Sequence, residues 1–394
     1  MKIVHVCLCD AYKEDWEYHR NLASEYDVEH GNSVYIISSS LSTDQNANWV
    51  FGESKKFDTS SGIHVYQLKN LFNKSLLLQS KTNGVIGIYK TLECIKPDII
   101  MVHNLQTLSL YEITKYKRAH PWVVLCGDTH ADFYNSARNF WSKKILNNII
   151  YKKIINDNIK YFNKFFFHGV DTREFYEKMY SLSIPNAELS SIGAKVLDYQ
   201  TLIEERRKLR KFLGWDESKL YLLHSGKMNA RKKTKDILLA LSKIKSSNIE
   251  LNIIGNFTED QEKLLLPMIE ADPRVHFLGW KTAKELKKYL CISDLYLQPG
   301  TMSITLLNSL SVGTPAVIYP YKDYEQYFNG WEYLAKNSTE IQNRIEEALN
   351  DREDLLRRRV CAYNIAKEKI DISLFSSKLY NVKSSDKLVI KKLK

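Results

Sequence analysis

Short β-branched runs alternate with longer amphipathic stretches along almost the whole chain, and this alternation constrains the fold more than any other feature. A first series of expected strands runs through Lys2–Leu8, Ser33–Ile37, Ile63–Leu68, Asp98–His103, Trp122–Cys126 and Lys164–His168. A second series follows through Leu220–Ser225, Glu250–Ile254, Val275–Leu278, Asp294–Gln298 and Ala316–Tyr319. Strands that alternate with helices form parallel sheets, and continuous apolar strands indicate that helices cover both faces. The sequence therefore predicts an α/β protein with two doubly wound, Rossmann-like domains.

The two series also set the expected domain boundaries. We expect an N-terminal domain over 1–195 and a second domain over 196–350, with helices over 351–382 that pack back toward the N-terminal domain. The basic tail over 383–394 is expected to be frayed. Because open parallel sheets bind ligands beyond the carboxyl ends of their strands, we expect function in the loops after these strands, at a cleft between the two sheets.

Composition excludes several classes of protein. Hydrophobic residues make up 44% and charged residues 26%, as in an ordinary globular protein, and no run is apolar and long enough to span a membrane. The 57 basic against 46 acidic residues give a net charge of +11, which favours an acidic partner such as a nucleotide or anionic lipid. Without zinc-finger spacing or an RNP signature, nucleic acid is not expected. The N-terminus has no secretory signal pattern and the six cysteines form no Cys-x-x-Cys pair, so we expect a cytoplasmic protein.

A basic loop directly follows the expected strand Leu220–Ser225. It begins at Gly226 and carries Lys227, Arg231 and Lys232. Lysine ammonium groups can neutralise a pyrophosphate when the following helix also offers its N-terminal N–H groups. A solvated basic loop that caps the next helix is the alternative, and the basic run alone favours that alternative.

A second loop follows the expected strand Asp294–Gln298. Here the chain turns at Gly300, continues through Thr301 and Met302, and begins a helix at Ser303 and Ile304. Serine is a good N-cap, and the free N–H groups of a helix N-terminus attract an anion. By itself the segment is equally well explained as an ordinary β-α-β unit with good caps.

Taken together, the two segments resemble the donor-site signatures of the retaining GT-B glycosyltransferases, in particular those of family four that build bacterial surface glycans. Lys227 falls on the arginine and Lys232 on the lysine of the pattern Gly-Arg-x4-Lys-Gly, and Gly313 and Pro315 match its closing Gly-x-Pro. The turn at Gly255 and the strand ends at Leu278 and Gly279, Pro97–His103 and Ile192–Ala194 fit as well, so the resemblance covers nearly the full length.

The resemblance implies transfer of a sugar from a nucleotide-diphosphate sugar, with retention and with no metal or other cofactor. Lys227 and Lys232 would stabilise the charge that develops on the leaving diphosphate, which is chemistry that needs no protein nucleophile. It also implies a set of nucleotide-sugar contacts at Gly226, Arg231, Gly255, Gly300, Thr301, Met302, Ser303, Ile304 and Asn308.

Two positions depart from the family pattern. Gly300 and Asn308 stand where the family has glutamates that bind the donor sugar and the ribose. Asparagine still donates and accepts hydrogen bonds, whereas glycine offers only its backbone. The alternative interpretation is therefore a non-catalytic GT-B subunit that binds a glycan or a partner transferase. A nucleotide-sugar epimerase on the same double fold is a third, less favoured interpretation.

The N-terminal half is expected to bind a glycan or lipid-linked acceptor. His130 follows the strand Trp122–Cys126 at the place where the family often has a histidine near the reaction centre, and it would orient the acceptor hydroxyl or the leaving phosphate. We expect further acceptor contacts from His103, Asn104 and Asp128, and weaker ones from the region of His19. The alternative for His130 is a structural histidine.

The segment Asn139–Phe167 combines many lysines with Ile and aromatic residues. A basic, aromatic helix can rest on anionic lipid, which suggests a peripheral position on the inner face of the plasma membrane. The alternative, a helix packed on the sheet with its lysines in water, is slightly favoured by the sequence.

Overall fold

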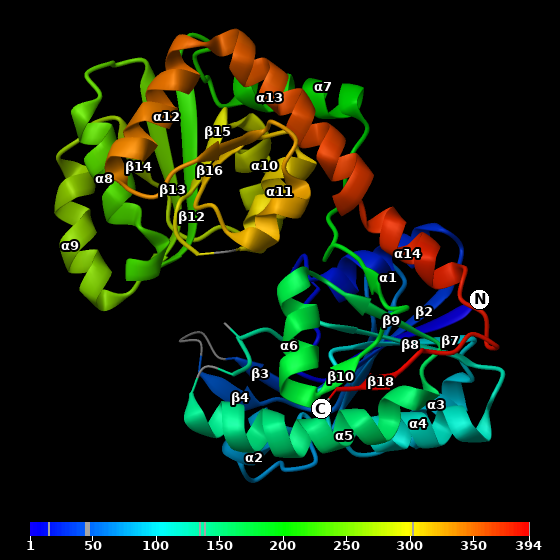
Figure 1. Ribbon diagram of the computed structural model, residues 1–394. Coiled ribbons are helices and arrows are strands. Elements are labelled where there is room, and N and C mark those ends of the chain that lie inside the picture. Colours follow the sequence, from blue (N-terminus) through cyan, green and yellow to red (C-terminus); the bar gives the residue numbers. More distant parts are fainter. Residues whose placement is uncertain (15, 44–47, 134, 138, 302, 394) are drawn as a thin grey trace. The chain divides into compact units, whose positions relative to one another are not determined.

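The computed structural model describes residues 1–14, 16–43, 48–133, 135–137, 139–301 and 303–393. The chain divides into two compact units (Figure 1). Unit 1 comprises Met1–Glu14, Tyr18–Ser191 and Ile372–Lys394, and unit 2 comprises Asp15–Glu17 and Ile192–Asp371. Each unit is an α/β structure built on a largely parallel sheet, as the sequence predicted.

The sheet of unit 1 has eight strands in the order β11-β9-β8-β7-β1-β2-β6-β5. Their bounds are β1 Lys2–Cys7, β2 Ser33–Ser39, β5 Lys55–Asp58, β6 His64–Leu68, β7 Ile99–His103, β8 Val124–Thr129, β9 Lys164–Phe167 and β11 Glu188–Leu189. All neighbours are parallel except β5, which is antiparallel to β6. The strand order reverses at β1, which pairs with β2 on one side and with β7 on the other, and open sheets bind their ligands beside such a reversal.

Helices cover both faces of this sheet (Figure 1). One face, with Val4 and Val6, packs on α3, α4, α5 and α6, and the other, with Ile3, packs on α1 and α14. The bounds of the helices are α1 His19–Glu29, α2 Leu76–Thr82, α3 Ile88–Ile95, α4 Leu110–Ala119, the π-helix η1 Ser142–Tyr151, α5 Lys152–Asn158, α6 Val170–Tyr180 and α14 Ile372–Tyr380. Buried strands between helices explain the continuous apolar runs of the sequence.

The prediction of a frayed C-terminal tail is wrong. Strand β18 (Lys391–Lys392) pairs antiparallel with β10 (Leu182–Ser183), and the side chain of Asn163 donates to the carbonyls of Ser384 and Asp386. Leu388 and Ile390 pack against the core of unit 1. The tail looks polar in sequence because its hydrogen-bond partners and its apolar contacts come from distant parts of the chain.

Several local details of unit 1 also differ from the expectation. The hydrophobic pattern of the sequence predicts helices over Glu14–Glu29 and Gly84–Ile95. In the structure α1 begins at His19 and α3 begins at Ile88, after Gly87 with its φ of 87°. The antiparallel strands β3 (Leu41–Thr43) and β4 (Trp49–Phe51) were not expected, because a run of three residues carries no clear period.

The sheet of unit 2 has six parallel strands in the order β14-β13-β12-β15-β16-β17. Their bounds are β12 Leu220–Met228, β13 Ile249–Phe257, β14 Val275–Phe277, β15 Leu295–Gln298, β16 Ala316–Ile318 and β17 Glu332–Leu334. The strand order reverses at β12, which pairs with both β13 and β15. Gly226 and Lys227, which were expected in a loop, lie in the last residues of β12, because this strand continues to Met228. Arg231 and Lys232 lie in the segment after β12, and Gly300 and Thr301 lie in the loop after β15.

Helices also cover both faces of the unit 2 sheet (Figure 1). Apolar residues of α8, α9 and α12 pack on one face, and those of α7, α10 and α11 pack on the other. The bounds are α7 Tyr199–Phe212, α8 Thr234–Lys243, α9 Glu259–Glu270, α10 Ala283–Ile292, α11 Ile304–Ser311, α12 Ser338–Asn350 and α13 Arg352–Ile365. The segment predicted over 351–382 is divided, with α13 in unit 2 and α14 in unit 1. Among the described residues, no helix is both long and apolar enough to cross a membrane.

Candidate functional site

Three glycines bring the ends of β12, β13 and β15 together in unit 2. Gly226 and Gly255 are register partners with φ of 128° and 149°, and a Cβ on Gly255 would lie 1.8 Å from the carbonyl oxygen of Gly226. A Cβ on Gly300 would lie 2.2 Å from the carbonyl oxygen of Arg231. Only glycine fits such backbone contacts, so the two loops expected to bind the donor are packed directly against each other.

The side chain of Lys232 lies over Gly226, one of these three glycines. A Cβ on Gly226 would lie 2.9 Å from Cε and 3.0 Å from Nζ of Lys232, so the ammonium group sits above the backbone of Gly226. Burial lowers the pKa of Lys232, and no carboxylate of the described residues offsets that loss of hydration. Lys227 and Arg231 are exposed. The loop therefore holds one half-buried ammonium group beside exposed cations.

The N-terminus of α11 completes this group. The Ser303 hydroxyl caps the helix by accepting from the N–H of Thr305, and the Ser303 N–H donates to the hydroxyl of Tyr324. The Gln298 side chain donates to that hydroxyl and to the Thr301 carbonyl. Of the other predicted contacts, Ile304 is exposed at the start of α11, Asn308 is half-buried on its second turn, and Met302 lies outside the described residues.

Sequence reasoning missed His224 in β12, whose ring holds the neighbouring segments in place through two hydrogen bonds. Its Nδ1 donates to the Leu297 carbonyl at 2.7 Å, and its Nε2 accepts from the Thr234 hydroxyl at 3.0 Å. Burial lowers the pKa of His224 to about 4, so the imidazole is neutral at neutral pH. It links β12 to β15 and to the start of α8, and its position inside an apolar strand is the only signal for it in the sequence.

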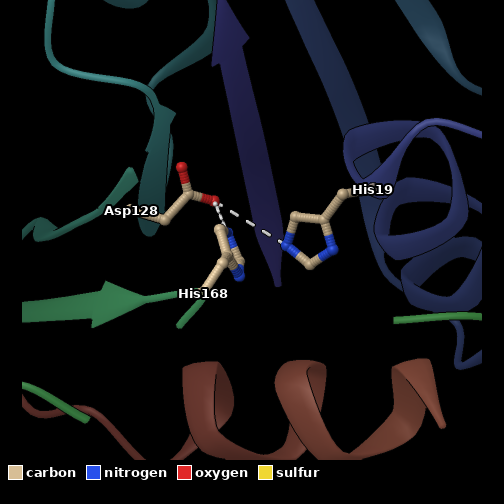
Figure 2. A group of neighbouring side chains, drawn as sticks. All are labelled: His19, Asp128 and His168. Carbon is tan, nitrogen blue, oxygen red and sulfur yellow. Dashed lines mark ion pairs between the residues drawn. The ribbon is translucent and has the colours of Figure 1, made fainter. Parts of the chain in front are cut away.

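The second group of polar residues lies in unit 1, around the carboxylate of Asp128 near the end of β8. His103 at the end of β7 donates from Nδ1 to Oδ2 at 2.8 Å, and the backbone N–H of Asn104 donates to Oδ1 at 3.1 Å. Nε2 of His168 lies 3.2 Å and Nε2 of His19 lies 3.7 Å from Oδ2 (Figure 2). We call Asp128 and its surrounding imidazoles the histidine cluster.

His130 is the most exposed member of the histidine cluster. Its Nε2 lies 3.8 Å from Oδ1 of Asp128, and 35% of its side chain is exposed, against 3% or less for His19, His103 and His168. The structure therefore brings together all four residues predicted for the acceptor side: His103, Asn104, Asp128 and His130. Among the histidines of this cluster, His130 has the most accessible ring.

A hydrogen-bonded chain extends the cluster into the sheet. His103 Nε2 lies 3.0 Å from Nδ1 of His5, and Nε2 of His5 lies 2.9 Å from Oδ2 of Asp27, whose other oxygen accepts from the hydroxyl of Tyr380. Two imidazoles therefore connect the buried carboxylates of Asp27 and Asp128.

Burial and charge oppose each other in this cluster. Burial raises the pKa of Asp128, but the charge of His103 and the hydrogen bond from His103 outweigh the effect of burial and hold that pKa well below its usual range. Burial lowers the pKa of His19 and His103, and it lowers the pKa of His130 to about 3. An ionised carboxylate thus sits among mostly neutral imidazoles.

The comparisons identify the chemistry of unit 2. Residues 205–368 match the family model described as glycosyl transferases group 1. Structures with the GT-B fold align over nearly the whole chain at low sequence identity, which establishes the fold. The chain is a GT-B glycosyltransferase. The predicted α/β fold is therefore confirmed.

Three solved structures illustrate this similarity. Anabaena HepE in complex with UDP-glucose is 14% identical, with a TM-score of 0.65 over 96% of this chain and 98% of that one. Sucrose-phosphate synthase from Thermosynechococcus elongatus is 11% identical, with a TM-score of 0.68 over the same shares. WaaG, a glycosyltransferase involved in lipopolysaccharide biosynthesis, is 13% identical, with a TM-score of 0.64 over 96% of this chain and 99% of that one. No curated protein sequence matches this glycosyltransferase.

Proposed function

We propose that this glycosyltransferase moves a sugar from a nucleotide-diphosphate donor to a glycan or lipid-linked acceptor, with retention of configuration at the transferred carbon. The observation that carries the proposal is the half-buried ammonium group of Lys232, which lies over the backbone of Gly226 with no carboxylate partner among the described residues. A buried cation without an anion is costly, and a bound diphosphate would supply the missing charge.

The transfer reaction leaves negative charge on the departing diphosphate. Lys232 would stabilise that charge most strongly, because it is partly desolvated, while the exposed Lys227 and Arg231 would help to attract the donor. The capped N-terminus of α11 adds N–H groups at the same edge of the sheet, and Asn308 on the next turn would contact the ribose. With these groups the proposed reaction needs no metal ion at the diphosphate.

In unit 1, we assign the acceptor side to His130. Its ring is the accessible member of the histidine cluster, and its low pKa keeps it neutral, so it can accept a hydrogen bond from an acceptor hydroxyl and hold that hydroxyl in place. Asp128 would hold the imidazole of His130 from the buried side.

Two of the similar structures guide the choice of donor and pathway. HepE was crystallised with UDP and with UDP-glucose, and WaaG acts in lipopolysaccharide biosynthesis. We therefore propose a UDP-hexose as the first donor to test, and synthesis of a surface polysaccharide or glycoconjugate at the cytoplasmic side as the process.

The test is the turnover of a Lys232→Ala variant with a panel of nucleotide sugars. We expect the variant to lower turnover by at least about tenfold, which corresponds to about 1.4 kcal/mol of activation free energy. Lys235→Ala is the matched control, because Lys235 is an exposed lysine at the start of α8. Equal turnover of the two variants would contradict the assignment of Lys232.

One observation favours the alternative of a non-catalytic subunit. Gly300 touches the backbone of Arg231 and Lys232, so this structure has no room for a glutamate side chain at the position where the family binds the donor sugar. Calorimetry with nucleoside diphosphates separates the two functions. Binding together with turnover supports the enzyme, while binding of a glycan without any nucleotide binding would support the non-catalytic subunit.

We further propose that unit 1 rests on an anionic membrane. Large apolar side chains of η1 and the residues before it are exposed, with 67% of Phe140, 72% of Trp141 and 58% of Ile149 in contact with solvent. The adjacent α2 exposes 70% of Leu77, and the Tyr151 hydroxyl donates to the Lys81 carbonyl, which holds α2 against η1. Lysines at 143 and 144 add the charge that anionic headgroups attract.

Sedimentation with vesicles tests this membrane contact. We expect binding to vesicles that contain phosphatidylglycerol, and weaker binding after Trp141→Ser. Trp122→Ser is the matched control, because Trp122 is 69% exposed but precedes β8, away from η1 and α2 in the sequence. If both variants and the unmodified chain bind the vesicles equally, η1 does not contact the membrane.

A further inference from the structure

The histidine cluster has the geometry of a metal site. Nε2 of His168 and Nε2 of His19 lie 3.2 and 3.7 Å from Oδ2 of Asp128, and all three ligand atoms lie within 4.8 Å of one another. A tetrahedral zinc ion with bonds of about 2.1 Å separates its ligand atoms by about 3.4 Å. We propose that His19, Asp128 and His168 bind Zn²⁺ or a similar divalent transition-metal ion in unit 1.

The tautomer of His168 supports this site. Its Nδ1 lies 2.9 Å from the Ser190 carbonyl, which can only accept, so Nδ1 carries a proton and donates it. Nε2 is buried and makes no hydrogen bond among the described residues. Figure 2 shows this nitrogen directed at the carboxylate of Asp128. A metal ion bound between Nε2 and Oδ2, which lie 3.2 Å apart, would give this buried nitrogen a partner.

Hydrogen bonds from His103 and Asn104 hold the carboxylate of Asp128 in place, as neighbouring residues do for a carboxylate that binds a metal. Oδ2 accepts from His103 Nδ1, and Oδ1 accepts from the backbone N–H of Asn104, which has a φ of 69°. Histidines that bind metals usually donate their other ring N–H to a carbonyl, as His168 does, and such contacts raise metal affinity. The three ligands also come from separate, well-packed elements: α1, β8 and the residue after β9.

The three ligand residues are buried. The ring of Phe375 covers His19, with the two ring centres 4.4 Å apart, and shields that side of the site from water.

This inference goes beyond the proposed function and does not rest on it. The proposed metal-free reaction concerns the diphosphate and the residues of unit 2, whereas the ion would be bound by residues of unit 1. His130, at 3.8 Å from Oδ1 of Asp128, would then lie beside a fixed positive charge. The ion would stabilise unit 1 and hold its imidazoles in place.

The experiment uses the full-length chain without a histidine tag, dialysed against a chelator and then titrated with Zn²⁺ in a calorimeter. We expect one equivalent of Zn²⁺ to bind and to raise the unfolding temperature, and Co²⁺ to give the strong visible absorption of a tetrahedral site. His168→Gln and His19→Gln should each lower the affinity at least about 100-fold.

Two control variants exclude other sites. His64→Gln alters an exposed histidine that pairs with Asp58 in the same unit, and Cys9→Ser removes one of two neighbouring thiols, so both variants should keep the affinity of the unmodified chain. His168→Cys offers a thiolate instead of the imidazole and should restore Co²⁺ binding with a sulfur charge-transfer band. Absence of Zn²⁺ binding in the unmodified, folded chain would overturn the proposal, as would equal affinity in His168→Gln, and a proton would then occupy the space between His168 and Asp128.

Discussion

The carboxyl ends of the parallel strands carry different kinds of groups in the two units. In unit 2, glycines remove side chains so that the loops after β12 and β15 touch through their backbones, and the half-buried Lys232 lies above them. In unit 1, the ends of β7 and β8 and the residue after β9 carry a buried carboxylate surrounded by imidazoles. One site is built from backbone and a positive charge, and the other from side chains around a negative charge.

This difference determines what each site tolerates. A site built from backbone contacts is sensitive to any added atom, whereas a site built from coupled side chains is sensitive to the loss of a single charge. The following predictions test this contrast in order of decreasing effect, and hydrogen exchange measured peptide by peptide assigns each effect to a unit.

The largest effect is expected from Asp128→Asn in unit 1. The substitution keeps the shape of the side chain but replaces one acceptor oxygen by an N–H₂ group, which faces the N–H donor of His103 or of Asn104. Two buried donors then lack an acceptor, which costs about 4 kcal/mol in all. Chemical denaturation should show this loss, with increased exchange confined to peptides of unit 1. A loss below about 1 kcal/mol would mean that the carboxylate does not organise the cluster.

Gly255→Ala should lower the stability of unit 2 by about 3 kcal/mol, because its Cβ would lie 1.8 Å from the Gly226 carbonyl oxygen and its φ is 149°. Gly214→Ala is the control, since Gly214 has a φ of 66° and open space around the added Cβ, so that only about 1 kcal/mol is lost. If both variants unfold at the same denaturant concentration, the backbone contact between β12 and β13 is not tight.

Unit 2 should lose stability in mild acid through His224. Its pKa is about 4 in the folded state and 6.5 as the ordinary value, so the unfolded state takes up a proton first as the pH falls below 6.5. The difference reaches about 2 kcal/mol at pH 5. His224→Gln removes this titrating group. The unfolding free energy of the variant should therefore fall less between pH 7 and pH 5 than that of the unmodified chain. Parallel pH profiles would contradict the prediction.

The smallest effect is a gain of stability, which we expect from Lys232→Met. Because burial lowers the pKa of Lys232, the folded state releases its proton more easily than the unfolded state, and the charged form costs stability at neutral pH. Lys232→Met should therefore raise the stability of unit 2 by about 1 kcal/mol, a gain that disappears as the pH approaches 10.5, while donor binding is lost. Lys235→Met, on the surface of α8, should leave both properties unchanged.

Much of the fold could be predicted because its signals are local. The apolar runs located the strands of both sheets except β5, β11 and β17, and Ser303 gave the start of α11 to within one residue. The donor-site segments of unit 2 could also be predicted, because Gly226, Lys232 and Gly300 lie close to the carboxyl ends of expected strands in the sequence. A glycine directly after an apolar strand marks a tight turn or a close backbone approach, so these positions stand out in the sequence itself.

The histidine cluster could be predicted only in part, because its members are scattered. His103, Asp128 and His130 lie at or next to the ends of β7 and β8 and were predicted on the acceptor side. His5 lies inside β1 and His168 directly follows β9, and these two were not predicted. His19 was only a weak candidate. Their proximity depends on strand order, which places β1, β7, β8 and β9 side by side, and periodicity contains no information about that order.

The path of the chain has a consequence for biosynthesis. Unit 1 is interrupted after Ser191 and resumes only at Ile372, and its last strand, β18, pairs with a strand made about 200 residues earlier. A ribosome therefore completes every residue of the group 1 domain before it releases α14 and the tail. Until β18 is translated, β10 lacks this partner strand, so the fold of unit 1 is completed only after unit 2 has been translated.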